Sequence, residues 1–100
     1  MRALIKGGRV IDPANLVDSQ LNVLIEDRHV VSLTTQEPHA DTVIDANGKI
    51  VAPGFIDIHM HEDPVNEKHQ IEYCIYNSML QMGVTTAVGG NCGSNACHPV

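Results

Sequence analysis

The chain has 100 residues, of which 43% are hydrophobic and 18% are charged, with 8 glycines and 5 prolines. This composition is typical of a globular domain and excludes a chain that is mainly disordered or fibrous. No apolar run approaches the roughly 20 residues needed to cross a bilayer, and residues 1–8 lack the features of a secretory signal. We therefore expect a cytoplasmic protein with no membrane partner.

The net charge is -6, from 6 Lys and Arg against 12 Asp and Glu, and only 3% of the residues are aromatic. Without a basic cluster or a row of aromatic rings, the chain has neither a surface that tracks phosphates nor one that stacks bases, so we expect no nucleic-acid partner. Three cysteines cannot all pair within one chain, and in a reducing compartment they are better explained as thiols or metal ligands.

The first half of the sequence consists of short runs rich in Val, Ile and Leu that are separated by turn residues. The runs are residues 3–6, 9–11, 21–26, 30–33 and 42–45, and the turns include Gly7-Gly8, Asp12-Pro13 and Asn47-Gly48. Residues 26–29 suit a hairpin turn between two of these runs. This alternation predicts a small antiparallel β-domain over residues 1–52.

The pattern changes after Pro53-Gly54, where a strand, a helix and a second strand are predicted. Residues 55–59 and 84–88 are β-like. The positions between them that recur at helical spacing are Ile71, Cys74, Ile75, Ser78, Met79 and Met82.

The predicted helix has a clear end and two possible beginnings. Gly83 follows the last apolar position, where a glycine commonly terminates a helix, whereas either Asp63-Pro64 or Asn66 could start it. Strand, helix and strand within 34 residues make a βαβ unit, so we expect parallel neighbouring strands with the helix on one face.

The segment that carries chemistry is residues 53–61, PGFIDIHMH. Side chains alternate along a strand, which places Phe55, Asp57, His59 and His61 on one side. The apolar side chains at positions 56, 58 and 60 are expected to pack against the helix. Two imidazoles two residues apart converge on a point where a cation can bind at about 2.0–2.1 Å from each nitrogen. The spacing thus predicts a metal site at the C-terminal end of this strand.

Residues 51–61, VAPGFIDIHMH, preceded by a β-rich region, resemble the N-terminal part of the amidohydrolase superfamily. Residues 83–93, GVTTAVGGNCG, resemble the D-aminoacylase branch, the N-acyl-D-amino-acid deacylases. The resemblance implies an α/β fold in which residues 1–52 form part of a small β-sandwich. Residues 53–100 then form strand 1, helix 1, strand 2 and the following loop of a (β/α)8 barrel. Because such a barrel needs about 250 residues, we expect the sequence to be an N-terminal fragment.

The resemblance also implies roles for individual residues. His59, His61 and Cys92 are the implied metal ligands, and one or two divalent ions, by default Zn²⁺, are the implied cofactor. Independently of the resemblance, Asp57 lies on the same face of the strand as the two histidines, and it either accepts a hydrogen bond from an imidazole N–H or is held by backbone donors. The general acid and the remaining ligands are expected beyond Val100.

Three functions follow as expectations. The first is a metal-dependent amidohydrolase that cleaves the amide bond of N-acyl-D-amino acids with a metal-activated water, its partner being a small-molecule amide. The second is a cyclic-amide hydrolase of the dihydroorotase or hydantoinase type, which generally relies on a carboxylated lysine where this sequence has Cys92. The third is a non-catalytic module completed by another chain or by self-association as a homo-oligomer. The 100-residue chain alone is expected to be inactive.

Overall fold

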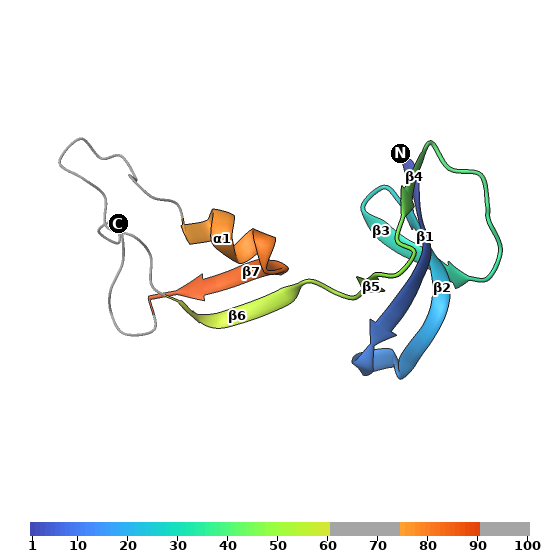
Figure 1. The fold of residues 1–100 in the computed structure, drawn as a ribbon. Coiled ribbons are helices and arrows are strands. Elements are labelled where there is room, and N and C mark those ends of the chain that lie inside the picture. The colour runs from blue at the N-terminus through green and yellow to red at the C-terminus, as the bar shows by residue number, and fades with distance from the viewer. Residues whose placement is uncertain (61–74, 91–100) are drawn as a thin grey trace. The chain divides into compact units, whose positions relative to one another are not determined.

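The computed structural model of the chain describes residues 1–60 and 75–90. The chain divides into two compact units, Met1–Pro53 and Gly54–Val100 (Figure 1). Within the described residues, no helix is long and apolar enough to span a membrane.

The first unit is a five-stranded sheet. Its elements are β1 (Arg2–Asp12), a 3-10 turn (Pro13–Asn15), β2 (Val17–Glu26), β3 (His29–Thr34), β4 (Thr42–Asp45) and β5 (Ile50–Val51). The strand order is β3-β2-β1-β4, and β5 pairs with β1 beyond the end of β4. The central strand β1 therefore has partners on both of its edges.

The sheet is mixed, so the prediction of an antiparallel domain is wrong for two of its strands. β1, β2 and β3 pair antiparallel in sequence order. β4 and β5 pair parallel to β1. The connection over residues 35–41 returns the chain to the start of β1, where Asp41 N–H donates to the Arg2 carbonyl over 2.9 Å. Whether β4 and β5 run parallel or antiparallel to β1 depends on such contacts between residues far apart in the sequence. The local pattern of apolar and turn residues carries no information about them.

Gly7-Gly8 is a bulge within one long strand and not the predicted turn between two strands. Gly7 has φ +78°, and the register of β1 against β2 shifts between Ile5 and Gly8. A left-handed glycine lets one strand take up an extra residue and continue. The freed Gly7 N–H donates to the side-chain oxygen of Asn22 over 2.9 Å.

The predicted hairpin and the turn before β5 are both confirmed. β2 ends at Glu26 and β3 begins at His29, and the two residues between them have φ of 45° and 73°, as in a two-residue hairpin with left-handed central residues. After β4, the Lys49 N–H donates to the Ala46 carbonyl over 3.0 Å, which closes a turn at Asn47-Gly48.

The core of the first unit is small and centred on β1 and β2. The buried apolar side chains are Ala3, Leu4, Val10, Val23, Leu24 and Ala46. Asn22 is the buried polar side chain among them. It accepts from Gly7 and also donates to the Gln36 carbonyl over 2.8 Å, so both of its polar atoms are satisfied.

The second unit contains the predicted parallel strand pair. β6 (Phe55–Met60) pairs parallel with β7 (Val84–Gly89), and α1 (Ile75–Gln81) lies over one face of this pair (Figure 1). Gly83 has φ +87°, and its N–H donates to the Leu80 carbonyl over 3.0 Å, so the predicted helix end is confirmed. Both predicted helix starts, Asp63-Pro64 and Asn66, lie outside the described residues.

The expected packing of the apolar side of β6 against the helix is wrong for two of its three residues. Ile56 and Ile58 are 66% and 69% exposed, whereas Met60 is buried, as is Met79 of α1. The reason is that α1 packs mainly on β7, and that irregularities interrupt the pairing of β6.

Candidate metal-binding site

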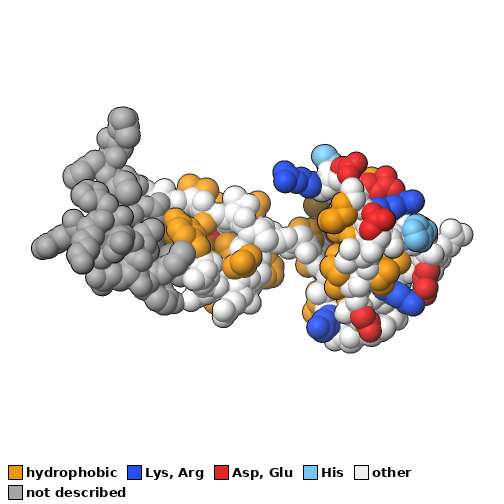
Figure 2. Space-filling model, turned by 90° about the horizontal axis from the view of Figure 1, so that it is seen from above, with side chains coloured by type: hydrophobic (Ala, Val, Ile, Leu, Met, Phe, Trp, Pro, Cys, Tyr) orange, Lys and Arg blue, Asp and Glu red, His pale blue; other side chains and the backbone are white. Residues whose placement is uncertain are grey.

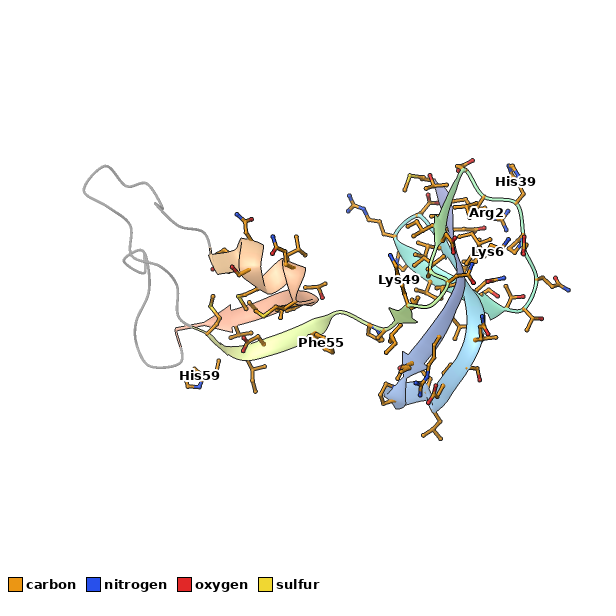
Figure 3. All side chains as sticks on the ribbon, in the orientation of Figure 1. Arg2, Lys6, His39, Lys49, Phe55 and His59 are labelled. Atoms are coloured by element: carbon orange, nitrogen blue, oxygen red, sulfur yellow. The ribbon has the colours of Figure 1, made fainter. Side chains whose placement is uncertain are left out.

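The predicted site is at the C-terminal end of β6. His59 is exposed there, and its side chain projects from β6 on the side away from α1 (Figure 3). Asp57 is half-buried on the same strand. Two other predicted ligands, His61 and Cys92, lie outside the described residues.

Asp57 contacts the backbone of the strand that carries it. Its Oδ1 accepts a hydrogen bond from the His59 N–H over 3.0 Å. The sequence left open whether this carboxylate binds an imidazole N–H or a backbone N–H. The hydrogen bond in the structure is with a backbone N–H. A carboxylate that accepts a local N–H competes with the sheet for that donor, which changes the course of the strand.

The pairing of β6 with β7 shows the same local change. Asp57 pairs with Ala87 and Met60 with Gly89, so β6 takes three steps where β7 takes two. This is the pattern of a bulge, which redirects side chains near the ends of strands. The strict alternation expected for the whole segment is thus interrupted between Asp57 and Met60.

The beginning of β6 is fixed by close contacts with β7. Phe55 N–H donates to the Gly83 carbonyl over 2.8 Å. A Cβ built on Gly54 would collide with the side chain of Thr85, so only glycine fits at this position. In the sequence, Pro53-Gly54 was interpreted only as the boundary between two segments, and the contact with Thr85 was missed. A glycine next to a strand is nevertheless a signal that another chain segment approaches the backbone closely.

The donors present suit a divalent metal ion. An exposed imidazole at the C-terminal end of a parallel strand occupies the end at which (β/α)8 enzymes build their sites. Imidazole and thiolate are the ligands that zinc favours, and the sequence places His61 and Cys92 after the ends of the two strands. Over residues 1–60 and 75–90, no three side chains of His, Cys, Asp or Glu gather at one point, so the ligand set stays a prediction.

The two units differ in the character of their surfaces. Charged side chains crowd the first unit, whereas the described part of the second is almost without them (Figure 2). The exposed apolar side chains of the second unit are Phe55, Ile56, Ile58, Tyr76, Leu80, Met82 and Val88. Within the described residues, these side chains come from β6, from α1, from β7 and from the turn that joins α1 to β7.

The sequence matches a known family and known relatives. The model of the amidohydrolase family matches residues 42–98. Dihydroorotase of Citrifermentans bemidjiense is 42% identical over 99% of this chain and 22% of its own length. Dihydroorotase of Geobacter sulfurreducens is 39% identical over the same shares. The chain thus spans about a fifth of the length of these curated relatives.

Solved structures share the fold. N-acyl-D-glutamate deacylase from Bordetella bronchiseptica, solved with zinc and a phosphonate inhibitor, superposes with a TM-score of 0.74 at 33% identity, over 95% of this chain and 19% of that one. A D-aminoacylase structure gives 0.75 at 33% identity, over 98% and 20%. A D-hydantoinase gives 0.56 at 30% identity, over 67% and 15%.

These likenesses confirm the predicted architecture, in which part of a β-sandwich precedes the first βαβ unit of a barrel hydrolase. The expected resemblance to the N-terminal portion of the D-aminoacylase branch is confirmed as well. With its family model covering more than half of the sequence, the chain belongs to the amidohydrolase family.

Proposed function

We propose that the protein is a metal-dependent hydrolase that cleaves the amide bond of N-acyl-D-amino acids. The observation that carries this proposal is the likeness, over 95% and 98% of the chain, to structures of an N-acyl-D-glutamate deacylase and a D-aminoacylase. Because the chain covers only about a fifth of those proteins, much of the catalytic machinery is expected from sequence outside these 100 residues.

His59, His61 and Cys92 would hold the metal, with one or two zinc ions as the cofactor that fits these ligands. When bound, a divalent ion polarises the amide carbonyl and lowers the pKa of a water molecule toward about 7. Asp57 holds the backbone N–H of His59 and so fixes the path of the strand that presents the imidazole. The proton for the leaving amine requires a general acid, which we expect beyond Val100.

Metal analysis of the full-length protein tests the ligand set. The His59→Ala, His61→Ala double variant is expected to lose metal that the wild type retains after dialysis. A His29→Ala, His39→Ala double variant is the matched control, because both histidines are exposed in the first unit. Full metal content in the first double variant would refute the proposed site.

A cyclic-amide hydrolase is the second candidate, favoured by the 42% identity to a dihydroorotase. Turnover of N-acyl-D-amino acids, dihydroorotate and a hydantoin by the same purified protein separates the two candidates. The deacylase proposal expects turnover of the first substrate class and loss of metal in Cys92→Ala. Cys74→Ala is the control, and full metal content in Cys92→Ala would favour the cyclic-amide hydrolase.

A module completed by self-association is the third candidate, favoured by the exposed apolar side chains of β6. We expect the 100-residue chain alone to associate and to hydrolyse no amide. Sedimentation at several concentrations measures the first point and an amide-hydrolysis assay the second. A folded, monomeric chain at all concentrations would argue against this candidate, and turnover by the chain alone would contradict the need for a longer protein.

A further inference from the structure

We propose that Asn47 is a site of spontaneous deamidation, and that this modification loosens the turn between β4 and β5. The reaction belongs to the chain itself and needs only water as co-reactant. It is independent of the metal site and of the function proposed above.

The turn brings together the groups that the reaction needs. Asn47 and Gly48 are both exposed. Gly48 has φ +73°, and it carries no side chain that would hinder attack of its nitrogen on the Asn47 carboxamide, which lies beside Gly7. Among the hydrogen bonds of residues 1–60 and 75–90, none uses the Gly48 N–H.

The reaction proceeds through a cyclic imide. The Gly48 nitrogen forms a bond to Cγ of Asn47, the Cγ–Nδ2 bond breaks, and Nδ2 leaves as ammonia with the proton that the nitrogen gave up. Water then opens one of the two imide C–N bonds. One product is aspartate at position 47, and the other is isoaspartate, which carries the main chain through the former side chain.

The product conflicts with the contacts that hold the turn. In the native chain, Asp45 Oδ1 accepts from Asn47 Nδ2 over 2.7 Å and from the Asn47 N–H over 2.9 Å. After deamidation the Nδ2 donor is replaced by a second carboxylate oxygen, and two carboxylates at this separation repel each other. An isoaspartate also adds one methylene to the main chain inside the turn.

The turn matters because it sets the register of two strands. Ala46 N–H donates to the Lys6 carbonyl over 2.8 Å, Lys49 N–H donates to the Ala46 carbonyl over 3.0 Å, and Arg9 N–H donates to the Lys49 carbonyl over 3.0 Å. These three bonds join β4 and β5 to β1. A longer main chain between positions 46 and 49 cannot keep all three.

The chain supplies its own controls. Asn15 is also exposed, but Leu16 follows it and the Leu16 N–H donates to the Pro13 carbonyl over 3.2 Å. Asn22 is buried, and Asn77 lies within α1. None of these three asparagines precedes a glycine.

Peptide mapping by mass spectrometry tests the proposal on the full chain incubated at pH 7 and pH 9. We expect a gain of about 1 Da confined to the peptide with Asn47, faster at pH 9, with isoaspartate among the products. The Asn47→Ser variant has no carboxamide and is expected to gain nothing there, and the modified wild type is expected to melt at a lower temperature. Protection of Asn47 in the folded chain but not in denaturant would overturn the proposal. Equal modification of Asn15, or an unchanged melting temperature after complete modification, would also contradict it.

Discussion

The carboxylate of Asp57 accepts a hydrogen bond from the backbone N–H of His59 over 3.0 Å, at the point where β6 carries one residue more than its partner strand. The side chain thus shapes the backbone that presents an expected metal ligand. This role requires only an oxygen that accepts the hydrogen bond, so the amide oxygen of an asparagine at position 57 can serve equally well.

Asp57→Ala is therefore expected to weaken metal binding by the full-length protein by about 10–100-fold, the range found for residues that orient ligands. Asp57→Asn is expected to retain most of the affinity, because its side-chain oxygen still accepts from the His59 N–H. Titration against a competing chelator measures both variants. Equal loss in the two variants would show that the negative charge matters and not the hydrogen bond.

Gly54→Ala is expected to destabilise the second unit, because the new methyl group collides with the Thr85 side chain. The cost is about 1–3 kcal/mol, as for other overpacked positions. Adding Thr85→Ala removes two of the three colliding atoms and should recover part of the loss. Denaturant unfolding of both single variants and the double variant gives the coupling energy, and simple additivity would argue against the contact.

Asn22→Leu is expected to lower the free energy of unfolding by about 1–3 kcal/mol, the cost of leaving a hydrogen-bonding group without its partner inside the protein. The Gly7 N–H, in a half-buried residue, carries most of this cost, because Gln36 is exposed and its carbonyl can accept from water instead. Asn22→Asp can still accept from the Gly7 N–H but cannot donate to the Gln36 carbonyl. Its free energy of unfolding should therefore fall by less than that of Asn22→Leu. Urea unfolding measures both variants, and a neutral effect of leucine would show that the bulge does not depend on this side chain.

The ion pair between Arg9 and Asp18 predicts a pH dependence. Arg9 Nε and Nη2 donate to the two carboxylate oxygens over 2.8 Å each. These hydrogen bonds, and the charge of the guanidinium, lower the pKa of Asp18. A folded-state pKa below the unfolded value of about 3.9 adds stability above that pH, and this stability is lost as the pH falls through the lowered value.

The stability difference between the wild type and Asp18→Asn should therefore be present at pH 6 and vanish in strong acid. The pair is exposed, so the difference should be small and should shrink further in high salt. Thermal unfolding of both proteins from pH 2 to pH 7 measures it. A difference that grows toward low pH would contradict the assigned sign.

The features that sequence reasoning predicted correctly are those encoded within a few residues. Gly83 ends α1 because a left-handed residue is needed there, and the turn before His29 follows from the run of β-like residues on each side. The parallel pairing of β6 and β7 follows from the helix that joins them. Each of these depends on local geometry alone.

The features that it missed depend on contacts between distant residues. A Gly-Gly pair suits a turn as well as a bulge, and the Gly7 N–H bond to Asn22 decides between them only in the folded sheet. Similarly, the side chains of β6 do not alternate strictly between its two faces, because the Asp57 carboxylate accepts the His59 N–H at the bulge. The metal ligands stay predictions from their spacing and from the family resemblance, and for Asp57 the sequence left open whether an imidazole or a backbone N–H is its donor.

The double pairing of β1 has a consequence for the order in which the chain folds during synthesis. One edge of β1 is completed by β2, but the other waits for Thr42–Asp45 and Ile50–Val51. The nascent polypeptide must therefore emerge from the ribosome at least as far as residue 51 before β1 has partners on both of its edges. Until then the hairpins of β1, β2 and β3 present an open edge, to which a chaperone or a neighbouring nascent chain has access.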